Sequence, residues 1–568
     1  CARAEGPYFG STAGPKQAAL VHLLNGEIDT IDPAKSIGSY EFYVMPALFE
    51  GLTQYHPELP RPMAGLATHY ETNADFTKFR FYLRGHPAPR GVRLPSCADL
   101  SDKFLQGRTP SPDSARAYWS DGVPITAHDF VYSWRRFADP GTAAPQSDQY
   151  FLVKNARDVF TGKRPPSDLG VHAPDEFTFV VDLQSSATFF LEVITSYLFS
   201  AVPKHLVEAA RNRNAEATWT EPSQIVTSGP FVLRDYRRYE RLVLVPNTRY
   251  YDAHLVGLKE LVFLPVIDGT TVMNLYKAGD IMLTPGLSLS PLFTPVLSRK
   301  KDYHAGPGFG TLFVHISTRR TPFDNVLLRY ALNMATEKKV LTDFLGPGFV
   351  PATSFVAPIP EYPQPESLSV EVDGRIYDVL AFDVEGARSL LAKAGFTGGI
   401  RDGRRLEVPF HFPMLPEARP RAEILQQQWL QHLNISAKLI PREFNVHWRM
   451  VLERDYTGVA DFAVLPLYLD PNGFLEKFSG GPDNNPSGWT DPGYISNLEA
   501  ANTTLSRTGR MERLAACERT LLKAMPFLPF YHAAWSYLCK PFVRGLASHL
   551  FDIRAFKYVW IDKNWRPQ

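Results

Sequence analysis

The segment of residues 119–139 reads WSDGVPITAHDFVYSWRRFAD, and its second half carries a full set of helix signals. Thr126 is a favoured N-cap residue, and Asp129 three positions later completes the spacing of a capping box. Three aromatic residues then follow at i, i+4 and i+7 spacing: Phe130, Trp134 and Phe137. This spacing places the three rings on one face. We therefore predict a helix from Thr126 to Phe137 whose aromatic face packs into a core.

Outward from this helix, short apolar segments alternate with amphipathic ones. We expect strands at 18–24, 79–83, 177–184, 229–235, 241–246, 260–266 and 311–317. We expect helices at 270–278, 324–344, 383–394 and 421–433, and a strand or loop that enters a helix at 40–52. Residues 85–117 are rich in Pro, Ser and Arg, which is typical of a surface insertion. The alternation favours α/β lobes with mixed sheets.

The length and net charge of the chain limit the classes of protein that the sequence can represent. The chain has 568 residues, more than one hydrophobic core usually organises, so two or three lobes are expected. Its 60 Lys and Arg against 59 Asp and Glu leave a net charge of +1, which gives no reason to expect a nucleic-acid partner. No apolar run reaches the roughly 18–20 residues that a membrane span needs.

The four cysteines, Cys1, Cys97, Cys517 and Cys539, match no zinc or CxxC spacing. A bacterial lipoprotein is cut immediately before the cysteine that receives the lipid, so Cys1 is a candidate lipidation site. Residues 2–16 would then be a tether, and the membrane would be contacted only through the lipid. The alternative is an arbitrary chain start. Cys517 and Cys539 either form a disulfide in an oxidising compartment or remain buried thiols.

Motifs of catalysis are missing from the sequence. It contains no GxSxG, HExxH or GK[ST] motif, and the glycines of GPGFG at 306–310 precede a strand where a phosphate loop would precede a helix. We expect neither a cofactor nor a metal, and a binding protein in preference to an enzyme. Aromatic residues make up 13% of the chain. They serve mainly in hydrophobic cores, and they also line pockets that hold organic ligands.

The opening segment closely resembles a signature of the extracellular solute-binding proteins, family 5, which include the oligopeptide- and dipeptide-binding proteins of ABC importers. That signature runs W-S-[DN]-G-x-P-[VI]-T-A-x-D-F-V-Y-S-W. Further stretches are similar to the family in the same order: LFEGL at 48–52, SGPFVL at 228–233, LVPNTRYYD at 244–252, LYKAGDI at 275–281 and PFDNVLLRYALNMATEKK at 322–339. The resemblance covers about residues 18–560, essentially the whole chain.

The resemblance implies a type II periplasmic-binding-protein fold with three lobes and a hinge between the two that enclose the ligand. Lobe I would comprise 17–58, 202–309 and 535–568, lobe II would be an insertion at 59–201, and lobe III would cover 310–534. Closure would trap an oligopeptide or peptide-like solute for the permease subunits of an ABC importer. We expect a monomer in the periplasm or on the outer face of the cell membrane.

The resemblance implies that one wall of the ligand-binding site lies near residue 41. Glu41 falls seven residues before LFEGL, where oligopeptide binders keep an acidic residue beside the ligand. Tyr40, Glu41, Phe42 and Tyr43 would contact an extended peptide through backbone and side chains. The alternative for Glu41 is a solvated loop carboxylate.

The opposite wall departs from the family, whose G-W-x-x-D-x-x-[DE]-P stretch uses its first Asp to pair with the α-amino group of the peptide. The corresponding run here, AVLPLYLDP at 463–471, puts Val464 at the Trp position, Leu467 at the Asp position and Tyr468 directly after it. A three-residue gap would instead make Asp470 the anchor. Without a carboxylate a buried ammonium is strongly disfavoured, so the ungapped alignment implies a blocked peptide or a non-peptide solute.

A second stretch of this wall is GGPDNNPSGW at 480–489. Asn484, Asn485 and Trp489 stand where the family places polar and aromatic pocket residues, and the alternative is a plain turn. Two other classes of function remain open. The same fold could bind a sugar, an opine-like conjugate or a metal chelate, or the chain could be an extracytoplasmic sensor or hydrolase.

Overall fold

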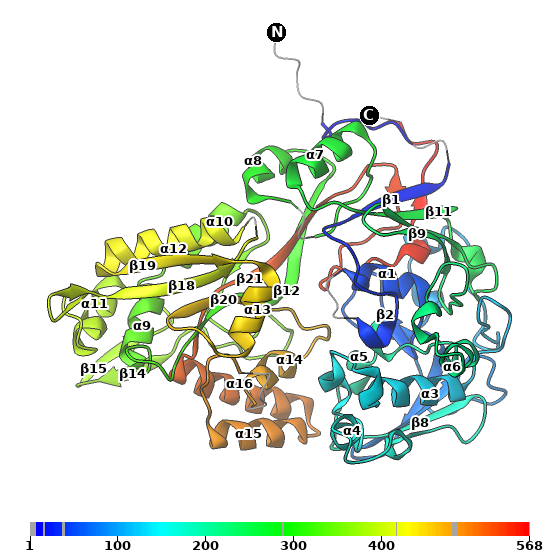
Figure 1. The fold of residues 1–568 in the computed structure, drawn as a ribbon, viewed down its shortest axis with the longest axis horizontal. Coiled ribbons are helices and arrows are strands. Elements are labelled where there is room, and N and C mark those ends of the chain that lie inside the picture. The colour runs from blue at the N-terminus through cyan, green and yellow to red at the C-terminus, as the bar shows by residue number, and fades with distance from the viewer. Residues whose placement is uncertain are drawn as a thin grey trace, which may run out of the picture. The chain divides into compact units, whose positions relative to one another are not determined.

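The computed structural model describes residues 7–14, 17–36, 40–286, 289–415, 417–479 and 485–566, and these form two compact units (Figure 1). Unit 1 comprises the described residues of Cys1–Leu289, Val296–His304 and Ser536–Gln568. Unit 2 comprises those of Ser290–Pro295 and Ala305–Trp535. Two strands, β12 (Tyr303–Ile316) and β21 (Phe527–Leu538), have residues in both units.

Unit 1 contains two larger sheets. The first is four-stranded and mixed, in the order β1 (Ala19–Leu24), β11 (Glu260–Pro265), β10 (Arg241–Pro246) and β9 (Phe231–Arg237). Only β1 and β11 run parallel in it. The second is five-stranded and antiparallel, in the order β6 (Val92–Arg93), β4 (Ala67–Thr72), β5 (Lys78–Leu83), β8 (Thr178–Asp182) and β7 (Val171–His172). The short pairs β2 (Thr53–Tyr55) with β3 (Pro62–Ala64) and β22 (Val543–Arg544) with β23 (Trp560–Ile561) are antiparallel.

Helices of unit 1 connect these strands. They are α1 (Glu41–Leu48), α2 (Asp102–Leu105), α3 (Ala127–Ala138), α4 (Ala156–Phe160), α5 (Phe190–Val193), α6 (Lys204–Asn212) and α7 (Gly269–Ala278). The short α8 (Thr294–Leu297) straddles the boundary between the units.

Helix α3 confirms the helix that we predict from Thr126 to Phe137. Thr126 and Asp129 form the capping box, with the backbone N–H of Thr126 donating to the Asp129 carboxylate over 2.8 Å. The three aromatic side chains are buried, and the Trp134 ring lies 5.0 Å from that of Phe179 on β8. The indole N–H of Trp134 donates to the carbonyl of Phe199 over 3.0 Å, so its polar atom is satisfied as well.

Unit 2 is built on a six-stranded mixed sheet, which confirms the expected architecture. Its order is β13 (Val350–Pro351), β21, β12, β20 (Val459–Val464), β18 (Glu407–Pro413) and β19 (Ser436–Arg442). Two hairpins, β14 (Ser369–Val372) with β15 (Arg375–Asp378) and β16 (Ile400–Arg401) with β17 (Arg404–Arg405), stand apart from it. The helices are α9 (Val326–Met334), α10 (Lys338–Leu345), α11 (Val384–Lys393), α12 (Ala418–Leu433), α13 (Phe444–Leu452), α14 (Asn472–Leu475), α15 (Pro492–Asn502) and α16 (Arg507–Ala524).

The single helix predicted at 324–344 is wrong, because it is divided into α9 and α10 and begins at the N-cap Asn325. Two residues of the break bond to α12 instead of continuing the helix. Thr336 Oγ1 accepts from the indole N–H of Trp429 over 3.0 Å, and the Glu337 N–H donates to the Gln428 side chain over 2.9 Å. Tertiary contacts thus override a continuous helical pattern.

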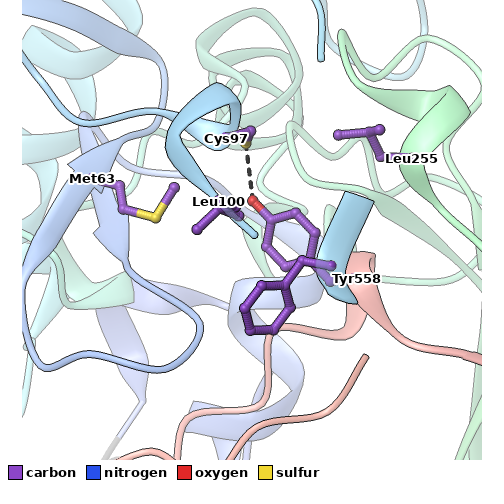
Figure 2. Close-up of a cluster of buried hydrophobic side chains, with 6 residues drawn as sticks. Met63, Cys97, Leu100, Leu255 and Tyr558 are labelled. Carbon is purple, nitrogen blue, oxygen red and sulfur yellow. Dashed lines mark hydrogen bonds between the residues drawn. The ribbon is translucent and has the colours of Figure 1, made fainter. Parts of the chain in front are cut away.

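Part of the insertion at 85–117 is buried, although its composition is typical of a surface segment. Cys97, Leu100 and Phe104 are buried in a cluster with Leu255 and Tyr558, and Figure 2 shows the Tyr558 hydroxyl beside the Cys97 sulfur, 2.9 Å away. Burial raises the pKa of the Cys97 thiol. The segment is therefore a packed strap that joins distant parts of unit 1.

The tether prediction is wrong for residues 7–14. The Phe9 N–H donates to both carboxylate oxygens of the buried Asp302, over 2.9 and 3.2 Å, and the Ser11 N–H donates to the Lys277 carbonyl over 2.8 Å. Lys540 donates to the Phe9 carbonyl over 3.2 Å. These residues form an N-terminal strap on unit 1. Cys1 lies outside the described residues.

Cys517 and Cys539 are both free buried thiols, so the disulfide alternative is wrong. Burial raises the pKa of Cys517 to about 11 and that of Cys539 to about 12. Both thiols therefore stay protonated at neutral pH, which is the state expected of structural cysteines.

Candidate ligand-binding site

Both predicted walls begin at the carboxyl end of a parallel strand pair. In unit 1, residues 25–36 follow the carboxyl end of β1, and α1 begins at Glu41. In unit 2, β18, β19 and β20 are parallel to one another, and the segment 463–470 leaves the end of β20. Ligands of open α/β sheets gather at carboxyl ends because loops there carry side chains and free backbone groups. The topology of each unit therefore supports the position of its predicted wall.

Glu41 holds its own segment together. Its side chain is 1% exposed, and its carboxylate accepts from the backbone N–H groups of Asp29, over 2.8 Å, and Tyr40, over 3.1 Å. A carboxylate in the first turn also interacts favourably with the helix dipole of α1. Glu41 is thus a buried structural group at the base of the wall, and the solvated alternative is wrong.

Tyr43 points into the interior of unit 1. It is buried, its hydroxyl donates to the buried Asp552, and its ring lies 5.0 Å from His22. Burial and the Asp552 charge raise the pKa of Tyr43 well above its usual range. Because residues 41–43 form the first turn of α1, their backbone is helical and not extended. The half-buried Tyr40 and Phe42 retain accessible surface.

The loop before α1 is fastened by contacts that sequence reasoning missed. Glu27 accepts from the Tyr236 hydroxyl over 2.5 Å and from the Tyr239 N–H over 2.6 Å, both in the β9–β10 hairpin. A Cβ at Gly26 would lie 2.5 Å from a ring carbon of Tyr40, so the glycine leaves room for this ring in its present position. The partners are about 200 residues apart, with separations of 209 and 212, so no local pattern reveals them.

In unit 2 the segment after β20 alternates between buried and accessible side chains. Val464 is buried and pairs with Thr311 on β12, Leu465 is 41% exposed, and Leu467 is half-buried. Tyr468 is buried, and burial raises its pKa well above the usual value. Leu465, Leu467 and Leu469 therefore keep accessible apolar surface in this segment.

Asp470 is committed to an internal ion pair. Its two oxygens lie 2.5 and 2.9 Å from the guanidinium nitrogens of Arg510 on α16, and the side chains are 4% and 2% exposed respectively. The Asn472 N–H also donates to the Asp470 carboxylate over 2.8 Å. This bidentate geometry is the strong form of a carboxylate–arginine contact. The position that a gapped alignment would make the ligand anchor thus neutralises a buried arginine.

Residues 485–489 form a tight turn. The Asn485 side chain donates to the Trp489 carbonyl and accepts from the Ser487 hydroxyl over 2.7 Å. The half-buried Trp489 ring packs edge-on against Tyr494, 5.2 Å away. Asn485 therefore matches the turn alternative, whereas Trp489 keeps a partly accessible ring. Asn484 lies outside the described residues.

A group of aromatic side chains at the same carboxyl edge was not predicted. Trp448 on α13 is 41% exposed and stacks on Phe462 of β20, with ring centroids 4.5 Å apart and planes 17° apart. Phe444, 43% exposed, continues the stack at 6.3 Å from Trp448. We call Phe444, Trp448 and Phe462 the aromatic ledge. Its signal was available, because Phe444 and Trp448 have the i, i+4 spacing of one helical face.

The described residues contain no group of three or more His, Cys, Asp or Glu side chains arranged to hold a metal ion. Within the same part of the chain, no helix combines the length and the apolar character that crossing a bilayer requires.

Solved structures share this fold. The Haemophilus influenzae protein OppA in complex with the peptide RPPGFSPFR is similar with a TM-score of 0.78 at 25% identity, covering 97% of this chain and 100% of that one. The murein tripeptide-binding protein MppA of Escherichia coli gives a TM-score of 0.78 at 25% identity, over 96% of this chain and 99% of that one. The fold thus defines a solute-binding protein of the periplasmic-binding type II class, as predicted.

The sequence comparison identifies the family. Residues 115–486 match the bacterial extracellular solute-binding proteins, family 5 Middle, and the chain belongs to this family. The periplasmic oligopeptide-binding protein OppA of Salmonella typhimurium is 29% identical over 540 residues, which are 93% of this chain and 89% of that protein. The probable deoxycholate-binding periplasmic protein YgiS of Escherichia coli is 25% identical over 440 residues, 76% of this chain and 78% of that protein. The family prediction is confirmed.

Proposed function

We propose that this chain captures an oligopeptide or peptide-like solute outside the cytoplasm and delivers it to the permease of an ABC importer. The observation that carries the proposal is similarity along nearly the whole length of a protein named for oligopeptide binding, with 93% of this chain covered. A related fold holds the peptide RPPGFSPFR. Members of this family are binding proteins, and we infer that the chain performs no catalysis.

Binding would follow the hinge mechanism of two-lobed receptors. We propose lobe I at 17–58, 202–309 and 535–568, lobe II at 59–201 and lobe III at 310–534. Closure of lobe III on lobe I would bury the solute and create the form that the importer recognises. Among the predicted site residues, those with accessible surface are Tyr40, Phe42, Leu467 and Trp489.

Thermal unfolding in the presence of candidate solutes tests the proposal. A ligand that binds only the folded state stabilises it by about 2.7 kcal/mol at a hundredfold excess over Kd. We therefore expect peptides of two to nine residues to raise Tm, whereas sugars and metal chelates leave it unchanged. A Tm that responds to a sugar or a chelate and to no peptide would overturn the proposal.

A non-peptide solute is the second candidate, and the relative named for deoxycholate binding favours it. Bile salts are included in the same screen for this reason. Recovery of the added peptide by mass spectrometry after incubation separates binding from hydrolysis. A binder returns the peptide intact, and a shortened product would point to an enzyme.

A further inference from the structure

Exposed basic side chains gather around the N-terminal strap of unit 1. They come from three segments that are far apart in sequence: Lys277 lies in the last turn of α7, Arg299 and Lys301 follow α8, and Lys563 and Arg566 follow β23. None of these five residues has an ion-pair partner in the part of the chain that the structure describes. Their charges therefore face solvent without a counter-charge at contact distance.

The N-terminal strap brings these three segments together. Besides its bond to the Lys277 carbonyl, its Pro7 carbonyl accepts from the Lys301 N–H over 2.8 Å. Its Tyr8 ring packs edge-on against Trp565, with ring centroids 5.7 Å apart. In Figure 1 the blue start of the described chain and its red end accordingly lie beside α7. We call the strap and the five basic residues around it the strap face.

The carboxylates beside the strap face do little to offset its positive charge. Asp302 is buried, and its two oxygens accept from the Phe9 N–H over 2.9 and 3.2 Å. Asp562 is 24% exposed and lies 3.7 Å from Arg544, which balances it. Within the three segments, as far as the structure describes them, Asp280 just after α7 is the exposed carboxylate. Five basic side chains against one exposed carboxylate leave a positive potential over this face.

Aromatic and aliphatic side chains lie among these charges. Tyr8, Phe9 and Trp565 are half-buried, and Val296 is 48% exposed. The Phe9 ring stacks on the buried Tyr276 with centroids 6.3 Å apart, which holds the strap to unit 1. Amphipathic rings beside Lys and Arg are typical of protein surfaces that meet the headgroup layer of a membrane. This mixture favours a lipid surface over a purely polar acidic partner.

We propose that the strap face is a docking surface for a membrane that contains anionic phospholipids. Its Lys and Arg side chains bind lipid phosphates, and the rings of the strap and of Trp565 rest at the headgroup level. Docking of this kind holds unit 1 at the membrane in which an importer lies. The inference goes beyond solute capture, and it holds whichever solute the protein takes.

Sedimentation with lipid vesicles tests the proposal. The full chain is used with Cys1→Ser, so that no acyl chain contributes to binding. Vesicles of phosphatidylcholine alone are compared with vesicles that also contain about 30% phosphatidylglycerol, and we expect at least about a hundredfold tighter binding to the anionic ones. Salt at about 0.5 M should remove most of this difference, because it screens exposed charges.

The test variant combines Lys277→Gln, Lys301→Gln and Arg566→Gln. Each Lys or Arg near an anionic surface strengthens binding about fivefold, so the triple variant should bind the anionic vesicles about a hundredfold more weakly. The three side chains are exposed, so the urea unfolding curve should stay that of the unsubstituted chain.

The β16–β17 hairpin of unit 2 supplies the matched control. Glutamine at its three exposed arginines changes the net charge by the same amount and should leave vesicle binding within about threefold: Arg401, Arg404 and Arg405. Equal weakening in both triple variants would reveal an effect of net charge alone and overturn the docking surface. An equal affinity for neutral and anionic vesicles would overturn it as well. Binding of polyglutamate without binding of the vesicles would assign the strap face to an acidic protein and also overturn the proposal.

Discussion

Asp470 is either a structural partner of Arg510 or an anchor for the α-amino group of a peptide. Its replacement by Asn distinguishes these two roles. The substitution keeps the shape of the side chain and removes its charge. Asp470 and Arg510 are 4% and 2% exposed and joined through two contacts of 2.5 and 2.9 Å, so neither group is solvated. Removal of one member of such a pair leaves a buried charge and costs about 3–5 kcal/mol. We expect a loss of that size in the free energy of unfolding of unit 2.

Urea unfolding followed by tryptophan fluorescence measures the loss, and titration calorimetry on the folded variant measures ligand affinity. The variant should bind the peptides of the wild-type protein with Kd within about threefold. Arg510→Met should cost a similar amount, and the double variant should recover much of it, because two matched neutral groups leave no stranded charge. Glu361→Gln is the control: its pair with Arg507, on the same helix as Arg510, is 66% and 64% exposed, so its loss should cost less than about 1 kcal/mol.

The opposite result would refute this reasoning. If Asp470 gripped the α-amino group of a peptide, Asp470→Asn would leave the unfolding curve nearly unchanged. It would also weaken peptides with a free amino terminus about a hundredfold or more, while acetylated peptides would be unaffected. That outcome would restore the gapped alignment.

Three further predictions concern His315, the N-terminal strap and Trp134. His315 is buried and its pKa is lowered to about 3, so the unfolded chain takes up a proton at this residue near pH 6.5 whereas the folded chain does not. The free energy of unfolding should therefore fall by about 1.4 kcal/mol per pH unit for this residue as the pH drops from 6.5 toward 3. Urea titrations of His315→Phe at several pH values should lack that share of the slope. Gly10→Ala should release the N-terminal strap, because Gly10 has φ +81° and a Cβ there would lie 2.3 Å from the Lys277 carbonyl oxygen; faster proteolysis within residues 7–14 checks this, and an unchanged rate contradicts it. Trp134→Ala should destabilise unit 1 by about 3–5 kcal/mol in urea unfolding, since the ring is fully buried.

Local chemistry explains why much of the fold was predictable. The capping box of Thr126 and Asp129 spans four residues, and the aromatic face of α3 repeats within three turns, so both signals sit inside one short segment. The Gly279 C-cap of α7, with φ +97°, and the Asp383 N-cap of α11 are equally local. These caps and this aromatic face depend only on residues that are close in sequence, and the structure confirms them.

Long-range partners explain what the sequence could not provide. The hydroxyl of Tyr43 bonds to Asp552, 509 residues away, and Asp470 meets Arg510, 40 residues away. Each of these side chains is polar and near a predicted wall, which made a ligand role reasonable. Whether a polar group is free or already paired depends on residues that no local pattern identifies. By contrast, the i, i+4 spacing of Phe444 and Trp448 is a local pattern that predicts a shared helical face.

The state of the two carboxylates on the proposed walls has a consequence for the ligand. Glu41 accepts two backbone N–H groups, and Asp470 balances Arg510, so each is already satisfied within its own unit. A buried ammonium that had to compete for either one would leave a stranded donor or cation, at a cost of at least about 1–3 kcal/mol. The apolar surface of Leu465 and Leu467 offers stabilisation without such competition. Selection by side-chain character, with little reliance on a free amino terminus, is therefore the arrangement that these contacts favour.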